Sequence, residues 1–286
     1  MNIRDYLSKS LMESSVESYL YDIEKYKKAN KNAEKYDYQK VMQYIELLRN
    51  EHSISNVKRI IASIKKYYDY LIEIGKRKDN PARAIRIRDG KENPIQLQDL
   101  FTEKELQILL VPRIERYPIL TKRNKIIMSL LVNQALRIGE IEQLKVTDID
   151  LEKATIQIKE TGVTNARNLL LKAEQILLLY EFINQDRNKL KTFRNDENAL
   201  LLGKLGTPIT KEDVDYLIST YQKQSKKKLT ATTIRQSVIA NLLTKNNDLR
   251  IVQYFAGHKS PDTTEKYRQT GLNALKTAIE KLHPIK

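Results

Sequence analysis

Apolar residues recur every three or four positions through the first part of this chain, and this spacing constrains its fold more than any other feature. Such a spacing marks one face of an amphipathic α-helix. It is found in three successive segments, which are residues 16–26, 38–48 and 53–71. Serines that can cap a helix, Ser14 and Ser53, stand before the first and third segments, and Gly75 stands where the third should stop. Residues 1–90 are therefore predicted to form a helical bundle.

A stretch rich in helix-breaking and basic residues follows, between residues 79 and 99. Its prolines and glycine, together with its weak apolar pattern, are typical of a loop between folded segments. The chain of 286 residues is long enough for two domains, each with a core of its own. We predict a first domain over 1–90, a linker over 91–100 and a second domain over 101–286.

The second domain opens with Thr102 and Glu105, which have the spacing of a helix capping box. Helical spacing then covers residues 103–110, 122–134 and 138–144. Apolar residues next alternate over 154–158 and 166–171, with Gly162 between the two runs, which predicts a β-hairpin with a long loop. Gly203, Gly206 and Pro208 mark a turn, and the segments after it return to helical spacing. The predicted fold class is mainly α with a small β-hairpin or sheet.

The composition narrows the classes of function. The formal net charge is +15 and the isoelectric point is about 9.6, which favours a polyanionic partner such as nucleic acid. The chain has no cysteine, which excludes disulfides and thiol nucleophiles, and its three widely separated histidines argue against a histidine-built metal site. Residues 1–15 lack the apolar core of a signal peptide, and no apolar run approaches the length of a membrane span. The expected location is the cytoplasm.

Basic residues occupy the faces opposite the apolar stripes of the first domain and continue into the predicted linker. Such a run usually forms only a solvated face. Because basic residues exceed acidic ones, contact with phosphate groups is a second interpretation. The candidate DNA-binding residues are Lys58, Arg59, Lys65, Lys66, Arg86 and Arg88.

Four residues of the second domain are candidates for chemistry: Arg137, Arg235, His258 and Tyr267. Each has an ordinary explanation when taken alone. A lone arginine on a helix is usually solvated or paired at the surface, a histidine after a glycine can cap a helix, and the chain has 16 tyrosines. Their order along the chain, and the motifs in which they lie, carry more information than any one of them.

These motifs resemble those of the tyrosine recombinases, the family of the lambda integrase and the Xer proteins. Ala135–Glu140 is similar to the box that holds the family's first arginine. Asp248–His258 is similar to the helix that leads to its histidine, and Thr263–Tyr267 is similar to the box of its nucleophile. In the first domain, Ser55–Tyr70 followed by Asn80–Pro81 resembles the family's core-binding domain, which is a helical bundle of the SAM-like kind. The resemblance covers nearly the whole chain.

The resemblance implies an enzyme that cuts and rejoins DNA through a 3′-phosphotyrosine. Tyr267 would be the nucleophile, and Arg137 and Arg235 would bind the non-bridging phosphate oxygens, where charge builds up in the transition state. A free tyrosine side chain has a pKa of about 10, so a cationic pocket would favour the phenolate that attacks. The energy of the phosphate ester is kept in the protein–DNA bond. No ATP, metal ion or other cofactor is therefore expected.

The resemblance assigns the remaining catalytic residues less directly. Lys159, at the end of the first predicted strand, is the candidate for the lysine that protonates the leaving 5′-oxygen, although its surroundings differ from the usual Gly-Lys-Gly; Lys153 is the alternative. Glu140 either orients the arginine network or is a surface carboxylate. Thr232 stands where the family usually has histidine or lysine, and its hydroxyl cannot act as an acid or base near neutral pH. Either His258 has a larger role or the chemical step is slow.

Partners and assembly also follow from the resemblance. The expected ligand is double-stranded DNA with an inverted-repeat core site, bound by a homodimer on each site and a homotetramer in the synapse. Apolar residues between Leu272 and Leu282 would dock on a neighbouring protomer or pack on their own domain. No arm-binding domain precedes the first predicted helix, which favours a simple Xer-like or resolvase-type enzyme.

Several functional alternatives stay open at this point. The biological task can be resolution of dimers or cointegrates, or integration and excision of a mobile element. A type IB-like topoisomerase would share the phosphotyrosine chemistry. A DNA-binding protein with weakened catalysis is conceivable because of Thr232, although the presence of both arginines, His258 and Tyr267 argues against it.

Overall fold

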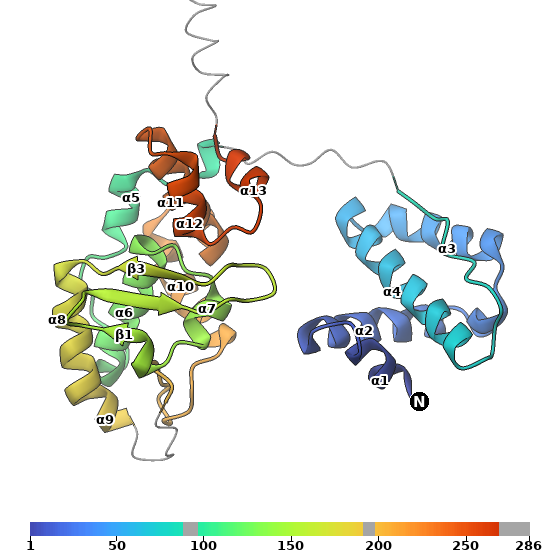
Figure 1. Cartoon of the computed structure of the whole chain (residues 1–286), viewed down its shortest axis with the longest axis horizontal. Helices are drawn as coiled ribbons and strands as arrows, with labels where there is room; N and C mark the ends of the chain where they lie inside the picture. Colours follow the sequence, from blue (N-terminus) through green and yellow to red (C-terminus); the bar gives the residue numbers. More distant parts are fainter. Residues whose placement is uncertain (88–96, 191–197, 269–286) are drawn as a thin grey trace, which may run out of the picture. The chain divides into compact units, whose positions relative to one another are not determined.

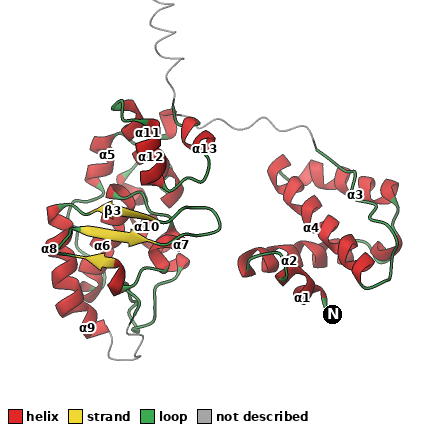
Figure 2. Cartoon of the chain, viewed as in Figure 1, coloured by secondary structure: helices red, strands yellow, loops and turns green. Residues whose placement is uncertain are grey.

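The computed structural model describes residues 1–87, 97–190 and 198–268. The chain forms two compact units, Met1–Asn93 and Pro94–Lys286, and each has a hydrophobic core of its own. Figure 1 shows both units coloured along the sequence, and Figure 2 shows that helices dominate each of them.

The described part of the first unit is entirely helical apart from its loops. Its elements are α1 (Ile3–Ser8), α2 (Glu13–Ala29), the 3₁₀ helix η1 (Ala33–Lys35), α3 (Tyr38–Glu51) and α4 (Ile54–Glu73). The predicted cap of α4 is confirmed, since the Ser53 hydroxyl accepts a hydrogen bond from the backbone of Asn56 at 3.4 Å. Helix α4 also stops at the predicted glycine, because Gly75 has the left-handed φ of 73° that favours glycine. The cap predicted for the first segment is wrong, since α2 begins at Glu13 after Met12.

The core of the first unit is built on α4, whose apolar face packs against α1, α2 and α3. Three tyrosines lie at its centre. The Tyr26 and Tyr68 hydroxyls are hydrogen-bonded to each other at 2.7 Å, and Tyr68 is 2.8 Å from the Ala33 carbonyl, which it donates to. The ring of Tyr67 packs against both of the other rings. The apolar faces that the helical spacing predicts therefore pack together into one hydrophobic core.

The second unit is also mostly helical but contains one small sheet. The described helices up to the sheet are η2 (Leu97–Asp99), α5 (Glu103–Ile108), η3 (Pro118–Leu120), α6 (Thr121–Asn133), α7 (Ile138–Glu142) and η4 (Val146–Asp148). Those after it are α8 (Ala173–Glu181), the π-helix η5 (Phe182–Asp186), α9 (Arg187–Leu190), α10 (Lys211–Tyr221), η7 (Gln222–Gln224), α11 (Ala231–Thr244), α12 (Leu249–Ala256) and α13 (Pro261–Glu265).

The sheet has the order β1-β2-β3, with antiparallel neighbours. Its strands are β1 (Ile149–Asp150), β2 (Thr155–Ile158) and β3 (Arg167–Leu170). Ile156 pairs with Leu169, and both side chains are buried, as the alternating pattern requires. The predicted hairpin is confirmed, and the pairing of β1 with β2 adds a strand that was not predicted. Figure 1 shows the loop between β2 and β3 extending beyond the strands.

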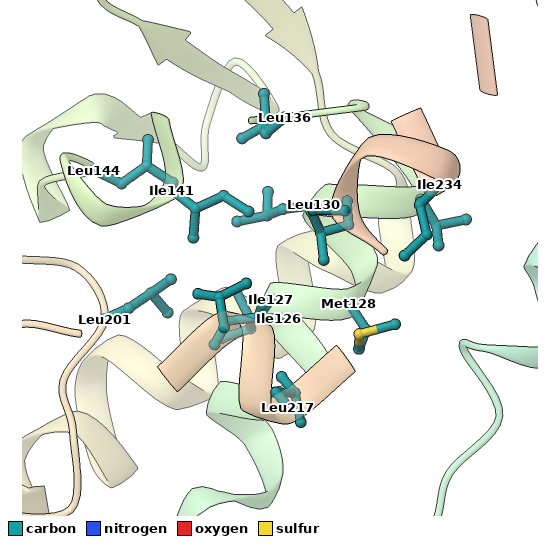
Figure 3. Packing of buried hydrophobic residues seen from close by; sticks show 14 of the residues in the cluster. Ile126, Ile127, Met128, Leu130, Leu136, Ile141, Leu144, Leu201, Leu217 and Ile234 are labelled. Atoms are coloured by element: carbon teal, nitrogen blue, oxygen red, sulfur yellow. The ribbon is translucent and has the colours of Figure 1, made fainter. Parts of the chain in front are cut away.

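Buried side chains from several helices meet at the centre of the second unit. Helix α6 contributes apolar residues around most of its circumference, including Ile126, Ile127 and Leu130, so it lies inside the domain rather than on its surface. Figure 3 shows these side chains close to Ile141 of α7 and Leu217 of α10. Helices α6 and α11 are in direct contact. This core holds in place the segments that carry the functional side chains.

The predicted fold class, mainly α with a small antiparallel sheet, is confirmed. The helices over 173–190 were not predicted, because a run of consecutive leucines and isoleucines there hides the helical period. Most of the predicted linker, over 91–96, and the apolar stripe at 272–282 lie outside the described residues. Within the described ranges, no helix has both the length and the apolar character needed to cross a membrane.

A buried carboxylate in the first unit leads to a test of its stability. Asp22 is 2% exposed and accepts hydrogen bonds from Arg59 and, at 2.8 Å, from the Ser63 hydroxyl. We predict that Asp22→Ala lowers the free energy of unfolding by roughly 2 kcal/mol, because buried donors lose their acceptor. Native-state hydrogen exchange of the α2 and α4 amides in the full chain measures it.

The matched control is Arg83→Ala. Arg83 is 76% exposed at its side chain and pairs with Asp69 at 3.3 Å, so its loss should change the same exchange energies by less than about 0.5 kcal/mol. Equal effects of the two substitutions would contradict a structural role for Asp22.

Candidate active site

Arg137 lies at the start of α7, directly after the buried core helix α6. Its backbone is extended, with φ of −79° and ψ of 152°, and its amide donates to the Glu140 carboxylate at 2.9 Å. This bond fixes the helix start and therefore the direction of the Arg137 side chain. The Nε of that side chain is buried and has no hydrogen-bond partner within the described residues. A buried arginine donor without an acceptor is suited to an anionic ligand.

Arg235 extends from the buried face of α11 and is 5% exposed. Its two terminal nitrogens donate to the backbone carbonyls of Ala135 and Ala256. Arg235 thereby connects the segment before Arg137 to the end of α12. Burial, and next the nearby charge of Arg137, lower the pKa of Arg235 to about 10, so it still carries its positive charge at neutral pH.

His258 follows the left-handed Gly257, whose φ is 67°, at the end of α12. The side chain is 2% exposed, and its Nδ1 lies 2.9 Å from the Thr264 hydroxyl. Burial, and next the charges of Arg235 and Arg137, lower the pKa of His258 from 6.5 to about 4. The imidazole is therefore neutral at physiological pH and can accept a proton or a hydrogen bond.

Tyr267 stands just after α13 and is half-buried. Its amide donates to the Thr264 carbonyl at 3.0 Å, and its side chain packs against the small apolar cluster of Ile239, Val252 and Ala256. The ring centroids of Tyr267 and His258 are 6.1 Å apart, and the two planes are inclined by only 14°. Three parts of the chain that are distant in sequence, around residues 137, 235 and 258–267, thus bring together Arg137, Arg235, His258 and Tyr267. We call these four residues, which are the candidates for catalysis, the catalytic cluster.

Glu140 is buried beside this cluster and is not a surface carboxylate, since only 4% of it is exposed. Its two oxygens accept from both terminal nitrogens of Arg167, at 2.8 and 3.0 Å, and one of them accepts from the Thr164 hydroxyl at 2.9 Å. Hydrogen bonds from Arg167 and its positive charge outweigh the cost of burial and lower the pKa of Glu140. The carboxylate stays ionised.

Sequence reasoning missed Arg167, although a signal was present. Arg167 and Leu169 occupy the inward positions of β3, and Asn168 and Leu170 occupy the outward ones. A charged residue at an inward position of an alternating strand is rare unless it has a buried partner. That partner is Glu140.

Comparison with known proteins agrees with this geometry. The sequence model of the phage integrase family matches residues 100–272 of this chain, and this range includes the whole catalytic cluster. The chain belongs to the phage integrase family. It is a site-specific tyrosine recombinase, an enzyme that cleaves and rejoins DNA strands.

Similar proteins extend the match to the first unit. The recombinase is 28% identical over 249 residues to the tyrosine recombinase XerC of Chlamydia pneumoniae, covering 85% of this chain and 77% of that one. It is 26% identical over 287 residues to the tyrosine recombinase XerD of Oceanobacillus iheyensis, covering 97% and 95%. The structure of the XerH site-specific recombinase bound to palindromic difH substrate, in a post-cleavage complex, has a TM-score of 0.72 at 22% identity, covering 93% and 79%. That structure has the same fold.

The two candidate lysines of the recombinase pair with aspartates that are not part of the catalytic cluster. Lys159 follows β2 and is 52% exposed, and its Nζ lies 3.4 Å from the buried carboxylate of Asp148. Lys153 is 80% exposed and pairs with Asp150 at 3.1 Å. The chain just after Lys159 is fixed beside the histidine, because Glu160 pairs with Lys259 at 2.9 Å. Lys159 therefore directly precedes a residue that is paired with the neighbour of His258.

Thr232 lies exposed in the first turn of α11, one turn before Arg235. Residues three apart on a helix share a face, so the threonine hydroxyl lies on the side of the helix from which Arg235 extends. The helix start itself is capped by Thr230, whose hydroxyl accepts from the Thr233 amide at 3.0 Å. Thr232 is thus not required as the cap.

The predicted DNA-binding residues of the first unit fall into two groups. Arg59 is engaged with Asp22, Ser18 and Asn56, and Lys65 donates to the Ile85 carbonyl at 2.7 Å. Lys66 donates to the Ser10 hydroxyl at 3.2 Å. Lys58 and Arg86 are exposed. Arg88 lies outside the described residues.

The lowered pKa of His258 predicts a dependence of stability on pH. The unfolded imidazole takes up a proton below about pH 6.5, whereas the folded one does so only near 4, so acid favours the unfolded state between these values. We expect the contribution of His258 to the free energy of unfolding of the second unit to be fully present above about pH 6.5. By about pH 4 the free energy of unfolding should have fallen by roughly 3 kcal/mol. Urea denaturation at a series of pH values measures it.

Between about pH 4.5 and 6.5, the free energy of unfolding of the variant His258→Asn should depend much less on pH than that of the wild type. Below about pH 4.5 carboxylates begin to titrate as well. His52→Asn, in the first unit, is the matched control and should keep the wild-type dependence on pH. A pH dependence that survives in His258→Asn would show that another group is responsible.

Proposed function

We propose that this recombinase cuts DNA by attack of the Tyr267 Oη on a backbone phosphorus atom. The new bond is a 3′-phosphotyrosine, the bond that breaks joins phosphorus to the 5′-oxygen, and the leaving strand keeps a free 5′-hydroxyl. The observation that carries the proposal is the catalytic cluster itself, in which Tyr267 lies against His258 and beside Arg235. Attack by a 5′-hydroxyl on the phosphotyrosine reverses the step and rejoins the strands.

Arg137 and Arg235 are assigned to the non-bridging oxygens of the reacting phosphate. The support is electrostatic. Glu140, the buried carboxylate beside the cluster, bonds Arg167 and the backbone of Arg137 rather than either of the two guanidinium groups. Both arginines keep a positive charge for the phosphate, and a planar guanidinium can bind two of its oxygens.

His258 is assigned as a neutral hydrogen-bonding group and proton acceptor. Thr264 holds its Nδ1, so Nε2 is the nitrogen that serves the substrate. Lys159 is assigned as the acid that protonates the leaving 5′-oxygen, which requires it to exchange Asp148 for DNA. Thr232 is assigned a hydrogen bond to a phosphate oxygen, and Glu140 the orientation of Arg137. With no acid or base at Thr232, proton transfer rests on His258 and Lys159.

We further propose that both units bind double-stranded DNA at an inverted-repeat core site. The net charge of +15 supports a polyanionic ligand, and the XerH structure contains such a substrate. In the first unit, Lys58 and Arg86 are free to contact phosphates, whereas Arg59 serves the fold first. We assign residues 1–90 as the core-binding domain and 101–286 as the catalytic domain. A homodimer on each site and a homotetramer in the synapse, in the cytoplasm, complete the proposal.

The biological task is proposed from the relatives. The full-length match to a XerD and the wide match to a XerC favour an Xer-like enzyme that resolves dimers or cointegrates, with mobile-element integration as the second candidate. Docking of the stripe at 272–282 onto a neighbouring protomer would couple the active sites of the tetramer.

The nucleophile is tested with Tyr267→Phe. Purified protein is mixed with nicked duplexes tiled from the DNA that flanks its gene, and protein–DNA adducts that survive SDS are counted. We expect adducts with the wild type and none with Tyr267→Phe, because only the Oη is lost. Tyr254→Phe, whose hydroxyl lies 3.1 Å from the backbone of Asn168, is the matched control and should still form adducts. Adducts in Tyr267→Phe would show that another residue attacks.

The acid is tested with a leaving group that needs no proton. We expect Lys159→Ala to slow cleavage by about 10²–10⁴-fold, the usual range for a general acid. A duplex with sulfur at the 5′-bridging position should restore the rate, since a thiolate leaves without protonation. Lys153→Ala is the control on both duplexes. The assignment moves to Lys153 if that variant, and not Lys159→Ala, shows the loss and the rescue.

A further inference from the structure

A buried ion pair beside the catalytic cluster has no part in the proposed chemistry. The side chains of Arg167 and Glu140 are 0% and 1% exposed, and they meet through two parallel hydrogen bonds of 2.8 and 3.0 Å. Burying two charges is costly, and such pairs often contribute little to stability compared with apolar residues of similar size. Stability alone is therefore a weak explanation for this pair.

Arg167 also holds the segment that carries the catalytic histidine. Its Nε donates to the Phe255 carbonyl at 2.9 Å, three residues before His258. Directly beside that bond, the Asn165 amide donates to the Gly257 carbonyl at 2.9 Å. One guanidinium thus bonds both the end of α12 and, through Glu140, the start of α7.

Gly257 shows how close this contact is. A Cβ at position 257 would lie 2.5 Å from Nη1 of Arg167 and 3.1 Å from the Asn165 carbonyl oxygen. The turn before His258 therefore packs its backbone directly on the guanidinium, and no side chain fits between them. A shift of Arg167 would be passed on to the position of His258.

The same pair determines which charges the phosphate meets. Three arginines, Arg137, Arg167 and Arg235, lie around the single carboxylate of Glu140. Both Glu140 oxygens bond Arg167, and their remaining bonds go to the Arg137 amide and the Thr164 hydroxyl. Without Arg167, this carboxylate would be free to pair with Arg137 or Arg235 and compete with DNA for them.

We propose that Arg167 is a positioning residue of this recombinase, which neutralises Glu140 and fixes the turn that carries His258 so that both catalytic arginines stay available to the phosphate. This inference rests on the roles proposed above for Arg137, Arg235 and His258. Arg167 itself does not touch the reacting atoms. Lysine cannot replace it, because one ammonium group lacks the planar fork that reaches both Glu140 oxygens and the Phe255 carbonyl together.

The test compares Arg167→Lys with a matched control, Arg123→Lys. Arg123 is also buried in the second unit, at 6% exposed, and its guanidinium bonds the Asn124 side chain and the Leu202 carbonyl, remote from the catalytic cluster. Single-turnover cleavage is measured at saturating protein on the nicked duplex that gives the wild-type adduct, and DNA affinity is measured on the same duplex. Thermal melts record the stability of each variant.

Arg167→Lys should cleave about 10- to 100-fold more slowly, as a displaced catalytic group would, with DNA affinity nearly unchanged. Arg123→Lys should lose stability but cleave at the wild-type rate. Nuclear magnetic resonance of the His258 ring gives a second readout: burial is the main cause that lowers its pKa, so the pKa should rise in Arg167→Lys, where the charge is kept but the turn is no longer held, and not in Arg123→Lys. A merely structural role would not move this titration selectively.

A wild-type rate and an unmoved His258 titration in folded Arg167→Lys would overturn the proposal. If that variant does not fold, Glu140→Gln combined with Arg167→Met removes both buried charges together, and it should cleave at least about tenfold more slowly than Glu140→Gln alone; equal rates of these two variants overturn the proposal equally. Failure of the catalytic assignment is separate, because it shows as adducts in Tyr267→Phe, whatever the behaviour of Arg167.

Discussion

The candidate active site of this recombinase depends on how two buried arginines, Arg167 and Arg235, and the half-buried Arg137 are held around one carboxylate. Like charges repel strongly where water is excluded, so each guanidinium needs compensation. Arg167 is compensated by Glu140, and Arg235 by the dipoles of two backbone carbonyls. Arg137, whose Nε has no acceptor in the described residues, is compensated least. The proposed site would therefore present its positive charge before an anion arrives, which is how enzymes stabilise charge in a transition state at little cost in reorganisation.

The two units use arginine and lysine differently, and contacts distinguish the uses. In the second unit, buried arginines position backbone segments around the site. In the first unit, Arg59 lies against the buried Asp22, and Lys65 ties α4 to the Ile85 carbonyl. Sequence shows all of these as one basic surface, because charge alone does not reveal which cations already have a partner. The exposed cations, such as Lys58, are the ones proposed to contact phosphate, and that contribution should weaken with salt in the way that counterion release requires.

Much of this could be predicted from the sequence, and the limits have physical causes. Helical spacing located most helices, and alternation located the hairpin, because both periods follow from backbone geometry. The helices near residues 173–190 were missed, since α8 is so rich in leucine that its two faces do not differ clearly. Arg137, Arg235, His258 and Tyr267 were recognised as a set, but Arg167 was not. Its role depends on contacts with residues 27 and 88 positions away, which no local pattern encodes.

The hairpin loop and the histidine turn are joined so firmly that they act as one part of the site. Thr164 forms a β-bridge with His258, the Asn165 amide bonds the Gly257 carbonyl, and Glu160 pairs with Lys259. Lys159 sits where this joined loop meets the sheet, and among the described residues its ammonium group pairs with Asp148. An exposed lysine on four rotatable carbons can reach a new partner without moving the backbone around it. The proposed site therefore combines a fixed set of charges, assigned to the phosphate, with one adaptable side chain, assigned to the leaving strand.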